Sequence, residues 1–247
     1  MEDVAVIAGR VPLQHVIVAP ATAVGELQQR WPQATAMAEP PGSGLYGAIN
    51  AAAAEVEDWQ WLTWINDDDR LLPGFEAIWR RAETEPTAAD VLYGEVDYLD
   101  ADGRRVAAMP VCRRPTDVPA LLAAGLAPFT QQGALISGDL WRRLGGLNAA
   151  LRIAGDFDFW IRAAAAGARF GFVPRTVAAF RVRAGQLSGG VTQAKDEETA
   201  VLRRRDLRVG RLDQWRAAVR FRIQNIPRIL QRIGRTGHLR SRRMMAR

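Results

Sequence analysis

The feature that most constrains this chain is a run of acidic residues placed directly after an apolar segment. Trp59–Ile65 alternates and then becomes wholly apolar, which predicts a β-strand, and Asn66, Asp67, Asp68 and Asp69 follow it without a spacer. Three adjacent carboxylates repel one another unless solvent or a cation screens them. In open α/β sheets, ligands bind at the carboxyl ends of the strands, where this run would lie. The pattern therefore predicts an α/β fold with a site at this strand end.

Two explanations fit the acidic run. Mg²⁺ and Mn²⁺ prefer oxygen ligands, and Mg²⁺ commonly takes one or two carboxylates together with substrate phosphates. Alternatively, Asp68 or Asp69 caps the helix that opens near Pro73. The run by itself leaves both explanations open.

The rest of the chain alternates predicted strands and helices in its first half and becomes hairpin-like later. A turn at Asp102-Gly103 predicts one such hairpin. We therefore expect a mixed, mostly parallel sheet flanked by helices. The predicted strands are His15–Val18, Thr35–Ala38, Trp59–Ile65, Asp90–Leu99, Arg105–Met109, Phe170–Val173 and Val177–Val182.

The positive charge of the chain is concentrated at its C-terminal end. Residues 201–247 contain fifteen arginines and two aspartates, a net charge of +13, whereas the whole chain carries +6. The preceding 200 residues therefore carry −7, which argues against nucleic acid as a ligand of the main domain. We expect two parts, a domain over residues 1–194 and a basic amphipathic helical tail over residues 195–247.

An apolar stripe predicts that the basic tail is helical. Its residues recur at intervals of three and four, and Pro227 is expected to divide the tail into two helical segments. The tail can act as an anchor on an anionic membrane surface. Alternatively, it packs the stripe on the body and leaves its arginines in solvent. The stripe consists of Trp215, Val219, Ile223, Ile226, Leu230 and Ile233.

The sequence also bears on the cellular compartment. A single cysteine, Cys112, excludes an internal disulfide and favours a reducing compartment. The first residues are acidic where a secretory signal carries bases, and no apolar run reaches the length of a transmembrane helix. We expect a cytoplasmic protein, peripheral at the inner face of the membrane.

Five motifs, in the same order along the chain, resemble those of family 2 glycosyltransferases, a large bacterial group. Gly42–Asn50 resembles the family stretch Gly-Ile-Tyr-Asp-Ala-Met-Asn, and Trp64–Asp69 stands in register with Leu-Asn-Ser-Asp-Asp. Asp90–Val96 is similar to Asp-Val-Val-Tyr-Gly-Asp. Gln131–Leu147 resembles a segment that ends Leu-Gly-Gly-Phe-Asp, and Arg152–Arg162 is similar to the helix start Ala-Asp-Tyr-Asp-Leu-Trp-Leu-Arg. The resemblance covers about residues 14–188.

The resemblance implies a GT-A fold, in which a Rossmann-like nucleotide half is joined to an acceptor half. Members of the family transfer a sugar from a nucleoside diphosphate donor to a saccharide or lipid-linked acceptor, with inversion at the anomeric carbon. For this chain the resemblance implies a role in cell envelope polysaccharide synthesis. It also implies that Asp68 and Asp69 hold Mg²⁺ or Mn²⁺, which would neutralise the departing diphosphate.

The same resemblance assigns roles to further residues. Asp156 occupies the position of the catalytic base that deprotonates the acceptor hydroxyl, although it can also be the N-cap of a helix. Asn66 and Asp68 lie on the donor side. Tyr46 and Asn50 match donor positions too, although they can instead form a helix packing face.

Three later residues complete the predicted site. Gln131 and Gln132 can hydrogen-bond acceptor hydroxyls, or they can be solvated in a loop. Arg183 stands where the family has histidine. It can pair with the donor diphosphate in a bidentate manner or remain a surface arginine.

Two departures from the family pattern support an alternative. The strand His15–Val18 runs into Ala19-Pro20, where the family has an aspartate that contacts the donor base. The family also begins with a strand and a helix, whereas Glu2–Gly9 looks like the remnant of that helix alone. The alternative is a degenerate, catalytically inactive domain that binds a partner or a nucleotide sugar.

Overall fold

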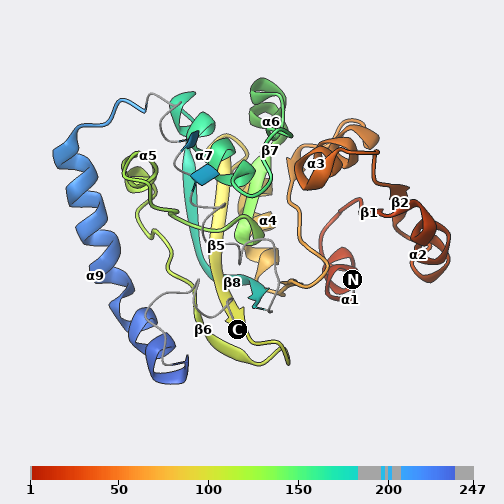
Figure 1. The fold of residues 1–247 in the computed structure, drawn as a ribbon, viewed down its shortest axis with the longest axis horizontal. Helices are drawn as coiled ribbons and strands as arrows, with labels where there is room; N and C mark the ends of the chain where they lie inside the picture. The colour runs from red at the N-terminus through yellow and green to blue at the C-terminus, as the bar shows by residue number, and fades with distance from the viewer. Residues whose placement is uncertain (1, 183–195, 198–199, 202–206, 237–247) are drawn as a thin grey trace.

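The computed structural model describes residues 2–182, 196–197, 200–201 and 207–236 (Figure 1). The strands are β1 (Val16–Ala19), β2 (Thr35–Ala38), β3 (Trp61–Leu62), β4 (Arg70–Leu71), β5 (Val91–Leu99), β6 (Arg105–Ala108), β7 (Ala134–Ser137) and β8 (Phe170–Arg181). The helices are α1 (Glu2–Ala8), α2 (Val24–Arg30), α3 (Gly44–Glu55), α4 (Phe75–Thr84), α5 (Val118–Ala123), α6 (Gly138–Leu144), α7 (Gly155–Ala165) and α9 (Arg211–Thr236). Short 3₁₀ turns include η1 (Ala21–Ala23), η2 (Pro115–Asp117) and η3 (Gln131–Gly133).

The strands form two separate sheets. Strands β1 and β2 pair in parallel as a two-stranded sheet, as expected for strands joined by a helical crossover. The larger sheet has the order β3-β7-β5-β8-β4, with β6 also paired to β5. Within it only β5 and β8 run parallel, and every other pair is antiparallel. The prediction of a mostly parallel sheet is therefore wrong, because the early parallel strands stand apart from the later hairpin-like ones.

The strand predicted over Trp59–Ile65 is also shorter than expected. Only Trp61 and Leu62 pair with another strand. Trp64 leaves the ladder and packs into an aromatic cluster, stacked on Trp160 with the ring centroids 6.5 Å apart and edge-on to Trp141 at 6.2 Å. Aromatic packing thus outweighs strand pairing here, and the acidic run forms a turn between β3 and β4.

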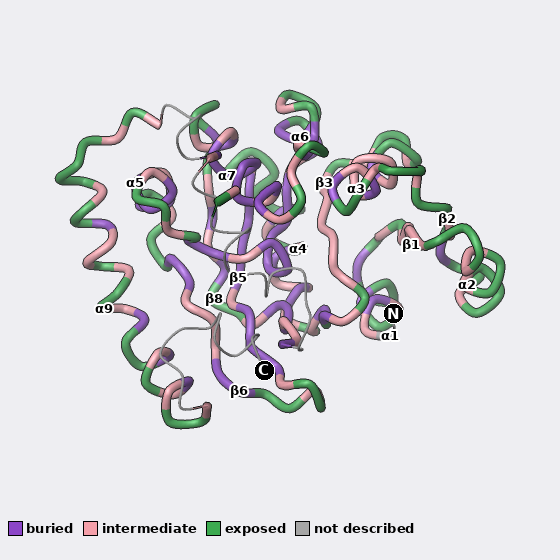
Figure 2. Tube along the Cα trace, in the orientation of Figure 1, coloured by how far each residue is buried: buried purple, intermediate pink, exposed green. Residues whose placement is uncertain are grey.

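The core lies on both faces of β5, where eight of the nine residues are buried (Figure 2). Val91 and Tyr93 point into a cluster with α5 and α7, whereas Leu92 and Val96 point into a second cluster with α4. This alternation is what a strand buried between two layers of helices requires. The hairpin predicted at Asp102-Gly103 is confirmed, since β6 returns antiparallel to β5.

The tail forms one helix rather than two. α9 runs from Arg211 through Pro227 to Thr236 and packs against β6 and α5. Contacts on both sides of the proline hold it: Asn225 bonds to the backbone of Val111, and Arg228 bonds to Met109 O. These tertiary contacts explain why the predicted break does not occur. No helix in the described parts of the chain combines the length and the apolar composition that crossing a bilayer requires.

Candidate functional site

The acidic turn is held by a buried carboxylate, Asp69, which is 7% exposed. Its Oδ2 accepts from Nε2 of Gln132 at 2.9 Å and from Nδ2 of Asn66 at 3.4 Å. Its Oδ1 accepts from the backbone N–H of Arg181 at 2.9 Å. One carboxylate therefore ties together the turn, the η3 segment and the end of β8. The helix-cap alternative for this run is wrong, because α4 begins at Phe75 after Gly74 and has no side-chain cap.

The electrostatics of Asp69 follow from its burial. Burial raises the pKa of its carboxyl group to about 6, and the neighbouring charge of Asp68 adds to this rise. The hydrogen bonds from Gln132, Arg181 and Asn66 favour the ionised form and oppose the rise in pKa. Asp69 thus keeps a negative charge at neutral pH in a place where that charge is costly. A cation beside it would lower this cost.

The carboxylate oxygens of the acidic turn fit Mg²⁺ or Mn²⁺ only when other ligands complete the coordination of the ion. Among the described residues, no group of three or more histidine, cysteine or acidic side chains is arranged to hold a metal ion. A site built from one or two carboxylates plus phosphate and water oxygens is nevertheless a common one for Mg²⁺. Exposed Asp67 and half-buried Asp68 directly precede Asp69 in this turn. The turn therefore suits an ion that arrives with a diphosphate, and does not suit a metal bound by protein alone.

Asp156 lies in the first turn of α7 and is half-buried. Its Oδ1 accepts from the backbone N–H of the next residue, Phe157, at 2.8 Å. The N-cap position belongs to Ala154, so the N-cap alternative for Asp156 is wrong. By contrast, Asp158 points into the protein, where it pairs with Arg162 at 2.7 Å. Asp156 is thus the carboxylate of this helix start that remains partly exposed.

Tyr46 and Asn50 connect α3 to the segment around α7. The Tyr46 hydroxyl donates to Ile153 O at 2.5 Å, and its ring lies so close to Gly155 that a Cβ there would come within 2.5 Å of it. Burial and the charge of Asp156 raise the pKa of Tyr46 above its usual range. Asn50 donates to Leu147 O at 2.8 Å and accepts from Leu147 N at 2.9 Å. The helix-packing alternative is therefore observed for both residues, and their donor role stays a prediction.

The two predicted acceptor glutamines lie in η3 and are both buried, so the solvated-loop alternative is wrong. Gln132 is committed to Asp69. The side-chain Oε1 of Gln131 is buried without a hydrogen-bond partner among the described residues. Arg183 lies outside the described residues.

The sequence analysis missed two residues that organise the site. Arg181 ends β8, donates from Nε to Asp68 O at 3.1 Å, and donates from Nη1 to Ala101 O at 3.1 Å. One oxygen of Glu197 accepts from three successive backbone N–H groups at Arg152, Ile153 and Ala154, at 2.8–3.2 Å. Both roles depend on contacts between distant segments, for which the local sequence carries no pattern.

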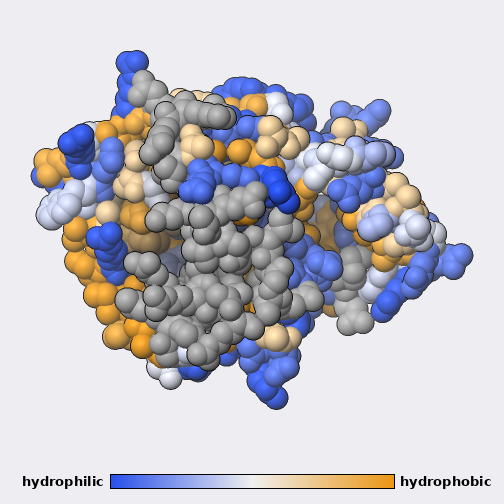
Figure 3. Space-filling view, in the orientation of Figure 1, coloured by the Kyte–Doolittle hydropathy of each residue, from blue (hydrophilic) through white to orange (hydrophobic). Residues whose placement is uncertain are grey.

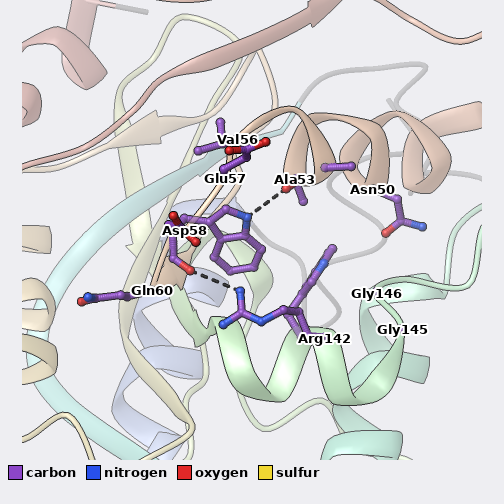
Figure 4. Close-up of a pocket in the computed structure, with 12 residues that line it drawn as sticks. Asn50, Ala53, Val56, Glu57, Asp58, Gln60, Arg142, Gly145 and Gly146 are labelled. Atoms are coloured by element: carbon purple, nitrogen blue, oxygen red, sulfur yellow. Dashed lines mark hydrogen bonds between the residues drawn. The ribbon is translucent and has the colours of Figure 1, made fainter.

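A pocket of about 720 Å³ lies between the end of α3 and α6 (Figure 4). It is lined by the indoles Trp59 and Trp141 and by Glu57, Asp58 and Arg142 among others. The Arg142 guanidinium lies 5.4 Å from the centroid of the Trp59 ring. Neither the acidic turn nor Asp156 lines this pocket, and Asn50 is the one residue of the predicted site that does.

No protein-family model matches the chain, and no curated protein matches its sequence. Solved structures do share its fold. The crystal structure of S. aureus TarS 1-349 is similar with a TM-score of 0.52 and 14% identity, over 87% of this chain and 62% of that one. The crystal structure of GalNAc-T7 with UDP, GalNAc and Mn²⁺ is similar with a TM-score of 0.57 and 13% identity, over 81% and 44%.

The chain thus spans less than two thirds of either of these two structures. Both are GT-A glycosyltransferases, so this chain has an α/β fold that resembles the GT-A fold. At such low identity the likeness defines the fold alone. The prediction of a GT-A-like architecture is confirmed to that extent.

Proposed function

We propose that this protein is a metal-dependent, inverting glycosyltransferase that uses a nucleoside diphosphate sugar. The observation that carries the proposal is the fold likeness to GT-A transferases, one of them solved with UDP, GalNAc and Mn²⁺. The acceptor is a saccharide or a lipid-linked sugar, and the reaction belongs to cell envelope polysaccharide synthesis at the cytoplasmic face of the membrane.

The nucleoside diphosphate sugar is bound by the residues that the sequence analysis assigns to the donor side. We assign Asp68 and Asp69 to Mg²⁺ or Mn²⁺ together with the diphosphate oxygens, and we assign Asn66, Tyr46, Asn50 and Arg183 to donor binding. When bound, the cation supplies charge neutralisation for the leaving diphosphate. The support for this assignment is the buried negative charge of Asp69, which Gln132 and Arg181 orient.

Asp156 is the general base of the proposed reaction. It takes the proton of the acceptor hydroxyl while that oxygen bonds to the anomeric carbon. The bond from this carbon to the diphosphate oxygen breaks, and the nucleoside diphosphate leaves with the electron pair. We assign Gln131 and Gln132 to the acceptor side, where they would have to turn toward the sugar, because Gln131 Oε1 is buried and Gln132 bonds to Asp69 among the described residues.

A matched pair of variants tests the enzymatic role. Asp156 and Asp139 each follow the glycine that begins a helix, α7 and α6 respectively. We expect Asp156→Asn to reduce UDP release from UDP-sugars with Mn²⁺ by roughly a hundredfold or more, because a positioned base contributes that much. Asp139→Asn should keep full activity, because Asp139 is fully exposed. Equal activity of the two variants would remove Asp156 from the mechanism.

A second candidate is a domain that binds a nucleotide sugar without turnover. Two observations favour it: β1 ends at Ala19, without the carboxylate expected there, and both oxygens of Asp69 already accept hydrogen bonds from the protein. Thermal unfolding with UDP and Mn²⁺ shows whether the protein binds a nucleotide at all, because a ligand that binds only the folded state raises the melting temperature of the protein. A rise with UDP and Mn²⁺ together, without UDP release, identifies the binder. No rise with Mn²⁺ and any of UDP, GDP, ADP or dTDP contradicts both candidates.

A further inference from the structure

α9 packs on the body through its polar face, whereas an ordinary surface helix packs through its apolar face. The residues it buries are Ala217, Asn225, Arg228 and Arg232. An amphipathic helix on a globular body normally buries its apolar stripe and exposes its charges. Here the predicted alternative, in which the Trp215 stripe packs on the body and the arginines are solvated, is wrong.

Polar contacts explain why α9 docks through this face. The Asn225 amide accepts from Val111 N and donates to Val111 O, both at 3.1 Å, and Arg228 donates to Met109 O and pairs with Glu95. Arg220 pairs with Asp117 through two bonds of 2.7 and 2.9 Å. Satisfied contacts of this kind fix the rotation of the helix, because breaking one leaves a buried polar group unpaired.

The fixed rotation leaves most of the apolar stripe in solvent, whereas Val219 and Ile233 are partly buried. Trp215 is 62% exposed, Ile223 61% and Leu230 61%, and Leu212 and Ile226 are also exposed. These residues are spaced at helical intervals on one side of α9. They account for five of the seven large hydrophobic residues that are exposed in the described parts of the chain. Figure 3 shows hydrophobic surface along the left edge of the molecule, where α9 lies.

Positive charge surrounds the stripe. Arg211, Arg216 and Arg222 are exposed on α9 beside it. The sequence of residues 237–247, which follows the helix, adds four arginines and contains no acidic residue. An apolar stripe with an indole and flanking arginines matches the boundary between the headgroups and acyl chains of an anionic bilayer.

We propose that the exposed face of α9 binds an anionic membrane surface, with Leu212, Trp215, Ile223, Ile226 and Leu230 inserted among the lipids. A second copy of the chain is the main competing occupant. In a two-fold contact the same arginines would face one another, which is repulsive. The proposal rests on α9 and on the charge of the sequence that follows it, and it holds whether or not the domain turns over a sugar nucleotide.

Vesicle co-sedimentation of the full chain tests this proposal. We expect binding to vesicles that contain phosphatidylglycerol, weaker binding at high salt, and little binding to phosphatidylcholine alone. Ile223→Glu should weaken binding roughly tenfold or more, because one large apolar side chain no longer enters the lipid. Ile223→Leu should bind like the unchanged protein. The matched control is Val6→Glu on α1, which places the same charge at a comparably exposed apolar position (53%) away from α9.

Three results would overturn the proposal. The first is no binding to either vesicle, and the second is equal binding by Ile223→Glu and Val6→Glu. The third is a dimer in light scattering that Ile223→Glu converts to a monomer, which would assign the stripe to a second copy. Since Ile223 is exposed, circular dichroism should show the unchanged fold in all variants.

Discussion

The two sheets of this protein differ sharply in how well they exclude water. Between residues 12 and 45, which include β1, α2 and β2, Ala34 alone is buried. In β5, at the centre of the larger sheet, all residues but one are buried, and helices cover both of its faces. A two-stranded sheet is marginal by itself because it has too little apolar surface to cover. The comparison teaches that the stability of the fold resides in the larger sheet. The smaller sheet adds little buried surface of its own.

Two tryptophans provide the largest expected contrast between these regions. Trp160 is 2% exposed and contacts the rings of Trp64, Phe129 and Phe159. Trp31 follows α2 and is only partly buried. We expect Trp160→Ala to lower the free energy of unfolding by about 3–5 kcal/mol, and Trp31→Ala to lower it by about 1 kcal/mol. Urea unfolding measures both, and equal losses would contradict the comparison.

A second test asks whether a buried ion pair also contributes to the stability of the region around the larger sheet. Arg162 bonds to Asp158, Leu144 O and Gly146 O, each at 2.7–2.8 Å. Removing its partner by Asp158→Ala leaves a buried, uncompensated cation, which should cost about 3–5 kcal/mol of stability. Asp139→Ala removes the exposed partner of Arg142 and should change nothing measurable. A small loss for Asp158→Ala would mean that solvent reaches Arg162.

The third test concerns the buried charge of Asp69. Its pKa of about 6 in the folded protein exceeds the ordinary value of 3.8. Between these values the folded state holds a proton that the unfolded state has lost, so stability falls as the pH rises. We expect the free energy of unfolding to increase by about 1 kcal/mol from pH 7 to pH 5 relative to Asp69→Asn. Parallel pH profiles for the two proteins would show that Asp69 is better solvated than its burial indicates.

The last prediction concerns Cys112, because the reactivity of its thiol reports local unfolding of the region around the larger sheet. It is buried, and burial raises the pKa of its thiol to about 11. Because the thiolate is the reactive form, alkylation at pH 8 should be undetectable in the native protein and rapid in urea. Ready alkylation without denaturant would show that this region opens more easily than the comparison states.

The sequence predicted the elements that depend on local pattern. β5, the hairpin into β6, the helix that begins near Asp156 and the tail helix all lie close to their expected positions. The division into two sheets could not be predicted, because it depends on which strands pair across long separations. The continuity of α9 through Pro227 and its inverted orientation depend on contacts with residues 95–117, which no helical periodicity reveals.

The candidate site shows the same division. The carboxylates could be predicted because their residue type and their position after a predicted strand point to them. The hydrogen bonds around them could not be predicted, because Gln132 and Arg181 reach Asp69 from segments 63 and 112 residues away in the chain. Glu197 is a further example, since nothing near it in the sequence indicates that it binds the backbone before α7.

The side chains of α9 that bond to Val111, Met109 and Arg105 have a consequence for solubility. β6 is the outer strand beyond β5, and an uncovered outer strand can recruit strands from other molecules into aggregates. On β6 itself, Arg235 of the helix donates to the backbone oxygens of Arg105 and Val106, which an incoming strand could otherwise use. We therefore expect the inner face of α9 to hinder ordered self-association, whatever its outer face binds.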